Sequence, residues 1–127
     1  MTATLEHTNL TVTNPDATAS WMCEVFGWRV RWAGPALNGG RSVHVGNDTA
    51  YVALYSPREP AHHGESSYAL IGGLNHIGVQ VEDLDAAERR IREAGFTPFN
   101  HADYEPGRRF YFHDADGIEY EAVQYDD

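Results

Sequence analysis

Two histidines occupy equivalent positions in two similar segments of the chain, and their side chains are suited to metal binding. His7 lies within residues 5–12 (LEHTNLTV) and His76 within residues 74–81 (LNHIGVQV), and the two segments align without a gap at an offset of 69 residues. Strand alternation places each histidine on the polar face of its segment. Neutral imidazoles and a carboxylate bind divalent transition metals, and three protein ligands leave positions open for water and substrate. Glu121 lies on another alternating segment, which makes His7, His76 and Glu121 candidate metal ligands; the alternative for each histidine is a half-buried side chain with a backbone partner.

Further residues are candidates for catalysis beside such a metal. Arg109, Tyr111 and His113 are in phase along one segment, and Glu119 shares the parity of Glu121. Arg109 can anchor an acidic group of a substrate or pair with a carboxylate of the chain itself. Tyr111, Glu119 and His113 are candidates for proton transfer, but Tyr111 can equally form a wall of the site. Because Glu119 follows a turn, a solvated position at the edge is favoured for it, and the general base stays open.

The elements that would position these residues follow a repeated plan. In the first half, alternation and turn residues predict strands over 4–12, 28–32, 41–45 and 49–55, and a helix over 15–26. In the second half they predict strands over 73–81, 108–113 and 118–125, and a helix over 83–94. Residues 57–72 lack periodicity and are expected to be a linker. We expect an α+β fold, in which two tandem βαβββ modules form a curved, cup-shaped mixed sheet with helices on the outside.

The composition excludes several classes of function. The 127 residues are expected to form a single domain over 1–127, with one module at about 4–56 and the other at about 73–125. The formal net charge of −10 argues against nucleic-acid and anionic-membrane partners, because both require clustered positive charge. The chain contains no lysine, which excludes lysine Schiff bases and the lysine of a phosphate-binding loop. Cys23 has no partner cysteine and residues 1–4 show no export signal, so we expect a cytoplasmic protein.

These residues resemble the vicinal oxygen chelate superfamily, which includes glyoxalase I, extradiol dioxygenases, fosfomycin-resistance thiol transferases and bleomycin-resistance proteins. The resemblance spans nearly the whole chain. It is carried in the first half by Leu5-Glu6-His7, Asn14-Pro15-Asp16 and Phe26-Gly27-Trp28, and in the second half by Leu74-Asn75-His76, Val81-Glu82-Asp83-Leu84-Asp85, Ala94-Gly95-Phe96 and Phe112-His113-Asp114-Ala115-Asp116-Gly117 leading to Glu121. It implies an open cup with metal ligands on the first and last strands of the modules, and His7, His76 and Glu121 fall on three of these places.

The fourth ligand place of this superfamily corresponds to Tyr51 or Ala53. Neither residue is the carboxylate expected of glyoxalase I, so glyoxalase I itself is not favoured. A set of two histidines and one glutamate is similar to the ligands of extradiol dioxygenases and of fosfomycin-resistance transferases. Fosfomycin is not favoured as the substrate, because the chain offers no basic cluster beyond Arg109 for its phosphonate.

The resemblance therefore implies a metal-dependent enzyme that acts on an oxygen-rich small molecule by Lewis-acid catalysis of the lyase, isomerase or dioxygenase type. The metal would be a divalent ion such as Fe, Mn, Zn, Ni or Co. The alternative is a non-catalytic small-molecule or drug-binding protein similar to bleomycin-resistance proteins, with Trp32, Tyr51 and Tyr55 available to a ligand. A third interpretation is an accessory module that binds a larger protein. We expect a homodimer, because the two modules leave sheet edges that need cover and relatives often pair modules across subunits.

Overall fold

The computed structural model describes residues 2–65 and 67–126 and divides the chain into two compact units. The first unit extends to His62 and the second begins at His63. Ser66, which belongs to the expected linker, lies outside the described residues. In the described residues, each unit holds one α-helix and one four-stranded sheet, which confirms the predicted α+β class and the duplicated βαβββ plan.

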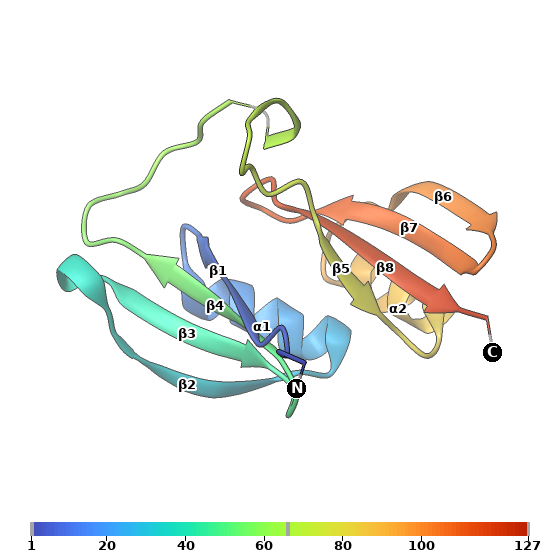
Figure 1. The fold of residues 1–127 in the computed structure, drawn as a ribbon, viewed down its shortest axis with the longest axis horizontal. Coiled ribbons are helices and arrows are strands. Elements are labelled where there is room, and N and C mark those ends of the chain that lie inside the picture. Colours follow the sequence, from blue (N-terminus) through green and yellow to red (C-terminus); the bar gives the residue numbers. More distant parts are fainter. Residues whose placement is uncertain (1, 66, 127) are drawn as a thin grey trace. The chain divides into compact units, whose positions relative to one another are not determined.

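The first module follows the order β1 (His7–Thr11), α1 (Pro15–Phe26), β2 (Arg29–Pro35), β3 (Arg41–Gly46) and β4 (Tyr51–Ser56). Its strands lie in the order β1-β4-β3-β2, as Figure 1 shows. The β1–β4 pair is parallel, and the other two pairs are antiparallel. A short 3-10 helix, Leu37–Gly39, joins β2 to β3.

The second module repeats this topology with β5 (Ile77–Gln80), α2 (Leu84–Glu93), β6 (Phe99–Tyr104), β7 (Gly107–His113) and β8 (Glu119–Tyr125). Its strands lie in the order β5-β8-β7-β6, with a parallel β5–β8 pair. The segment before β5 contains a 3-10 turn, Ser67–Ala69. In both modules the last strand is therefore hydrogen-bonded to the first.

The helix ends are set by the residues that predicted them. The Asn14 side chain accepts a hydrogen bond from the Ala17 amide at 3.1 Å, and Pro15 occupies the first turn of α1. Gly27 ends α1 in a left-handed conformation with φ of 71°. Asp83 caps α2 in the way that Asn14 caps α1, because its carboxylate accepts from the Ala86 amide at 3.0 Å.

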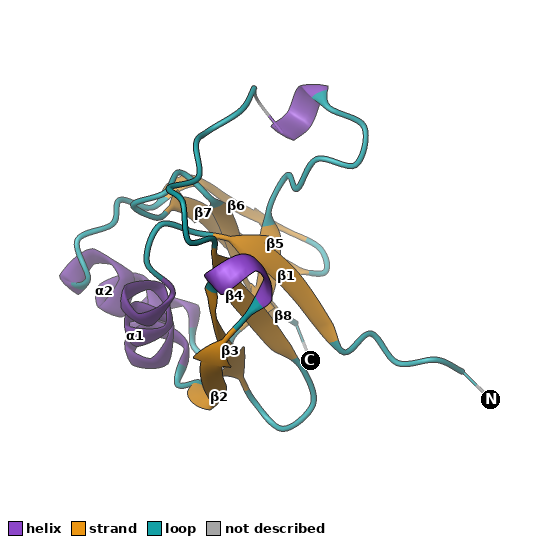
Figure 2. Cartoon of the chain, turned by 90° about the vertical axis from the view of Figure 1, so that its left-hand side faces the viewer, coloured by secondary structure: helices purple, strands orange, loops and turns teal. Residues whose placement is uncertain are grey.

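Each sheet packs one face against the helix of its own module (Figures 1 and 2). In the first module, the core comprises Val43, Val45 and Leu54 of the sheet with Met22 and Val25 of α1. In the second module, it comprises Phe110, Phe112, Tyr120 and Ala122 of the sheet with Ala87 and Ile91 of α2. Because side chains alternate across a strand, the intervening residues of β7 and β8 lie on the opposite face of their sheet.

One strand was not located from the sequence. Residues 99–104 form β6, whose register against β7 shifts between Phe99 and Ala102. Asn100 has a positive φ of 53° within this irregularity. The bulge breaks the strict alternation on which strand prediction depends, and this explains why β6 was missed. No helix in the described part of the chain is long and apolar enough to cross a bilayer.

Candidate metal and ligand site

The polar face of the second sheet gathers the site residues predicted for this half of the chain. The register pairs Tyr111 of β7 with Glu121 of β8, and His113 with Glu119. His76 immediately precedes β5, which is the other neighbour of β8. The topology thus places an imidazole on one side of the two glutamates and the β7 side chains on the other.

His76 lies between the two carboxylates. Its Nε2 is 3.1 Å from Oε1 of Glu121, and its Nδ1 is 3.8 Å from Oε2 of Glu119. Nδ1 is buried and has no hydrogen-bond partner among the described residues. The Glu121 and Glu119 side chains are only 12% and 14% exposed. The structure therefore brings together one of the two predicted histidine ligands and the predicted glutamate ligand.

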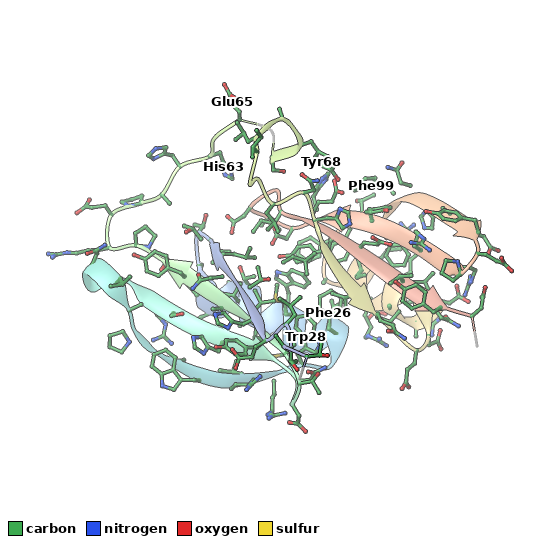
Figure 3. All side chains as sticks on the ribbon, in the orientation of Figure 1. Phe26, Trp28, His63, Glu65, Tyr68 and Phe99 are labelled. Carbon is green, nitrogen blue, oxygen red and sulfur yellow. The ribbon has the colours of Figure 1, made fainter. Side chains whose placement is uncertain are left out.

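The expectation that Glu119 is a solvated edge residue is wrong. Its carboxylate accepts a hydrogen bond from the Tyr68 hydroxyl and lies 3.3 Å from Nε2 of His113. Tyr68 projects from the 3-10 turn towards the sheet of the same module (Figure 3). The hydrogen bond to Glu119, with a smaller contribution from burial, raises the pKa of Tyr68 to about 12. Tyr68 and His113 thus cover the Glu119 carboxylate, although Glu119 directly follows a turn.

Arg109 contacts Glu121 from the β7 side. Its Nη1 donates to Oε2 of Glu121 at 3.0 Å, and its guanidinium carbon lies 4.6 Å from the centre of the Tyr104 ring. Its Nε and Nη2 atoms are buried and have no hydrogen-bond partner among the described residues. The next polar residue on β7 is Tyr111, whose ring meets His76 edge to face at 5.5 Å. Burial and then the charge of Glu121 raise the pKa of Tyr111.

The other predicted histidine, His7, belongs to the first module and is described there. Its Nδ1 is 2.7 Å from Oε1 of Glu6, and its ring stacks on Tyr51 at 4.9 Å. Tyr51 also stacks on His44 at 4.6 Å, and Arg31 lies over the Tyr51 ring. His7 pairs with Tyr51 in the parallel register, so Tyr51 is the strand neighbour of His7 and Ala53 is that of Asn9.

A fourth ring, that of Trp32, extends this cluster of His7, Tyr51 and His44. Trp32, which is half exposed, lies 5.1 Å from His44. Burial, followed by the nearby charges of His7 and Arg31, lowers the pKa of His44, so its imidazole is biased towards the neutral form. The first module therefore presents a row of π-systems comprising Trp32, His44, Tyr51 and His7.

The structure brings two of the three predicted metal ligands together within one module, and the third belongs to the other module. His76 and Glu121 lie side by side in the second module, whereas His7 belongs to the first, and its role as the third ligand stays a prediction. Within residues 2–65 and 67–126, no group of three or more His, Cys, Asp or Glu side chains is arranged to hold a metal ion.

No pattern in the sequence identifies several of the residues that surround His76 and Glu121. Tyr68 lies in the aperiodic segment 57–72, so no pattern pointed to its contact with Glu119. Tyr104 and Phe99 belong to the strand that was not located, and Phe99 stacks on His113 at 4.9 Å. His113 was noted for its parity, and its contact with Glu119 follows from the β7–β8 register.

The family of the chain is established by comparison with known proteins. Residues 4–122 match the model of the glyoxalase/bleomycin resistance protein/dioxygenase superfamily. The chain therefore belongs to this superfamily, as its two βαβββ modules and its sequence resemblance led us to expect. No match was found among curated proteins.

Several solved structures share this fold at low sequence identity. A glyoxalase/bleomycin resistance protein/dioxygenase domain from Frankia sp. EAN1pec is 23% identical, with a TM-score of 0.84 over 100% of this chain and 95% of that one. The fosfomycin resistance protein FosX from Listeria monocytogenes, solved with Mn(II) and sulfate, is 18% identical, with a TM-score of 0.72 over 99% and 95% of the two chains. TnmS3, an antibiotic-binding protein from Streptomyces sp. CB03234, is 20% identical, with a TM-score of 0.72 over 98% of each chain.

Proposed function

We propose that this protein is a metal-dependent enzyme that acts on an oxygen-rich small molecule by Lewis-acid catalysis of the lyase, isomerase or dioxygenase type. The observation that supports the proposal most directly is the 3.1 Å approach of His76 Nε2 to Glu121 Oε1 on the polar face of the second sheet. A nitrogen atom and an oxygen atom that can both coordinate a metal are thus adjacent, with the Glu121 side chain 12% exposed and the His76 side chain 34% exposed. His76 and Glu121 would supply two of the ligands of a divalent ion such as Fe, Mn, Zn, Ni or Co.

The surroundings of His76 fit a metal ligand. A ligating histidine commonly directs its second ring nitrogen to a carboxylate, which fixes the tautomer and the ring orientation. His76 Nδ1 is buried without a hydrogen-bond partner among the described residues, and the nearest carboxylate oxygen, from Glu119, is 3.8 Å away. A small movement of either side chain would form this hydrogen bond and leave Nε2 available to an ion. His7 is proposed as the third ligand on the sequence argument.

The side chains around the pair would have separate roles in the reaction. A bound divalent ion would supply Lewis acidity that stabilises negative charge on a substrate oxygen. Glu119 is proposed as the proton acceptor, because its carboxylate is held by Tyr68 and lies beside His113. Tyr111 stays protonated at neutral pH, since its pKa is raised, and it can therefore donate a hydrogen bond to the substrate. Arg109 orients Glu121 through Oε2.

A non-catalytic ligand-binding protein is the second candidate. The observation that favours it is the row of Trp32, His44, Tyr51 and His7 on the first sheet, which offers stacking surface to a planar molecule. The fold neighbour TnmS3 is an antibiotic-binding protein. In this case a ligand would stack on Trp32 and no metal would be required.

Metal content separates the two candidates. The full chain is purified without a histidine tag, and its metals are measured by mass spectrometry in the wild type and in His7→Ala, His76→Ala and Glu121→Ala. His101→Ala is the matched control, because His101 is paired with Glu88 on the surface of the same module. We expect a stoichiometric divalent ion in the wild type and the control, and its loss in the three ligand variants. A metal-free wild type that binds an aromatic ligand tightly would support the second candidate instead.

The setting of the proposed enzyme is a homodimer in the cytoplasm. Strands β2 and β6 are paired on one side only among the described residues, and exposed sheet edges are commonly covered by association. Cys23 is the only cysteine of the chain, which fits a reducing compartment. Light scattering of the purified chain tests the dimer, with the mass of one chain as the contradicting result.

A further inference from the structure

The guanidinium of Arg109 is hydrogen-bonded through Nη1, whereas the edge formed by Nε and Nη2 has no hydrogen-bond partner among the described residues. Its Nη1 donates to Glu121 at 3.0 Å. Its Nε and Nη2 are buried, and neither has a hydrogen-bond acceptor among the described residues. Buried donors of a charged group are nearly always paired, so two orphans on one side chain point to a missing acceptor.

The unused edge has the geometry of a carboxylate receptor. Nε and Nη2 present two parallel N–H groups, whose spacing matches the two oxygens of a carboxylate. The same chain shows this arrangement elsewhere, because Arg41 holds Asp16 through Nε at 2.8 Å and Nη2 at 2.9 Å. Arg109 lacks an equivalent partner of its own, although it is far more buried than Arg41.

The neighbouring charges and rings limit what can bind there. Glu119 and Glu121 contribute two negative charges beside the single positive charge of Arg109. With the divalent ion of the proposed function, these groups sum to one positive charge, which favours a monoanion over a dianion such as a phosphate monoester. Tyr104 over the guanidinium and Tyr111 along the same strand add aromatic surface.

We infer that the Nε–Nη2 edge of Arg109 is the binding site for the carboxylate of the ligand, and that the protein takes small aromatic or apolar carboxylic acids. The inference rests on the proposed function for the charge balance and for the second point of attachment at the ion. The carboxylate enters in the plane of the guanidinium, so Tyr104 can stay stacked on its face. Glu121 keeps its contact with Nη1.

The test compares two molecules of the same shape and different charge. Mandelate carries a carboxylate beside a hydroxyl and a phenyl ring, and mandelamide replaces the carboxylate with a neutral amide. Binding of each to the full chain is measured by calorimetry, once with Zn²⁺ and once after removal of metals by a chelator. We expect mandelate to bind about tenfold tighter or better, because charge-assisted hydrogen bonds to two donors are lost in the amide.

Variants of Arg109 and an NMR signal test whether the preference for mandelate arises at this side chain. Arg109→Gln should abolish the preference for mandelate, and Arg109→Lys should weaken it because lysine lacks the two-donor edge. Arg108→Gln is the matched control, since Arg108 is the next residue towards the N-terminus of β7 and contacts Asp85 at 3.5 Å. In nitrogen-15 NMR spectra, the Nε–H resonance of Arg109 should shift with mandelate while that of Arg41 does not. This signal and the wild-type comparison remain decisive if an Arg109 variant fails to fold.

The outcomes separate this inference from the proposed function. A preference for mandelate that depends on Arg109, and that is larger with Zn²⁺ than without it, supports the inference. Equal binding of the two molecules, or a preference that survives Arg109→Gln, overturns it even if Zn²⁺ binds. Persistence of the preference in a protein that binds no metal overturns the metal-dependent function and leaves the carboxylate site standing. Failure of both Zn²⁺ and mandelate to bind overturns both.

Discussion

Replacement of Tyr120 by phenylalanine tests the structure that holds the two carboxylates of β8 in place. Tyr120 lies between Glu119 and Glu121 on the strand, with its ring on the core side against Phe112 at 5.1 Å. Its hydroxyl donates to Oδ2 of Asp114 at 2.8 Å. The other oxygen of Asp114 accepts from the backbone amides of residues 116 and 118, so this carboxylate ties the β7–β8 turn to the core.

The magnitude follows from the loss of one buried hydrogen bond to a charged group. Such a bond contributes about 1.5–3 kcal/mol to the free energy of unfolding, and the phenyl ring of the variant keeps the packing of the tyrosine. An unfolding entropy of about 2.1 cal/mol/K per residue amounts to roughly 0.27 kcal/mol/K for 127 residues, if the chain unfolds in one transition. We therefore expect the melting temperature of Tyr120→Phe to fall by about 6–11 °C at pH 7.

The loss should depend on pH in a defined direction. Burial raises the pKa of Asp114 above its ordinary value of 3.8, and the hydrogen bond from Tyr120 works in the opposite direction. Removal of the hydroxyl lets the pKa of Asp114 in the folded variant rise further. A folded group with a raised pKa holds its proton to higher pH than in the unfolded chain, so stability is lost as pH rises above the unfolded value. The destabilisation should therefore be larger at pH 7 than at pH 4.5.

Chemical and thermal unfolding followed by circular dichroism at both pH values provide the measurement. Tyr125→Phe is the control, because Tyr125 is half exposed at the end of the same strand and should change stability by less than about 0.5 kcal/mol. A Tyr120→Phe variant that is as stable as this control at pH 7, or that loses more stability at the lower pH, would refute the reasoning.

Three further predictions concern the helix end, a surface pair and the tyrosine over the site. Gly27→Ala should cost about 1 kcal/mol in urea unfolding, because the backbone at Gly27 is left-handed and the added methyl group meets nothing within 4 Å, so the cost is conformational alone. Arg41→Gln should destabilise the protein slightly at pH 7 and by less below pH 4, because Arg41 lowers the pKa of Asp16 and the stabilisation is lost when Asp16 is protonated; urea unfolding of the variant and the wild type at both pH values checks this. Glu119→Gln should lower the pKa of Tyr68 from about 12 towards its usual value of 10, measured by NMR titration of ring-labelled tyrosine, and an unchanged pKa would contradict the contact.

The parts of the fold that depend on local signals were predicted well. The cap at Asn14, the proline after it and the glycine at position 27 fixed the ends of α1, because each acts within one turn of the chain. Strand parity also placed Arg109 and Glu119 on one face, since alternation survives wherever a strand is regular. Strand β6 was not predicted, because a bulge interrupts the alternation of its side chains between the two faces of the sheet.

The sequence predicted only those parts of the candidate site that follow from side-chain alternation along a strand and from the repeat of the two modules. The approach of His76 to Glu121 follows from the parallel pairing of β5 with β8, and the sequence repeat already led us to expect these two residues at one site. The contact of Tyr68 with Glu119 joins residues 51 positions apart through an irregular segment, and no local rule anticipates it. The unpaired edge of Arg109 depends on which atoms the folded chain leaves without acceptors.

The position of the last strand in each module has a consequence for synthesis of the chain. β4 lies between β1 and β3, and β8 lies between β5 and β7, so each sheet is completed by the strand that the ribosome makes last. The first module can close as soon as β4 has emerged, while the second is still being made. A nascent or truncated chain that stops before Glu119 leaves β5 and β7 with bare edges in place of a finished sheet, and such edges readily template aggregation. Loss of the segment from Glu119 onwards would therefore remove the inner strand that joins β5 to β7 in the second module.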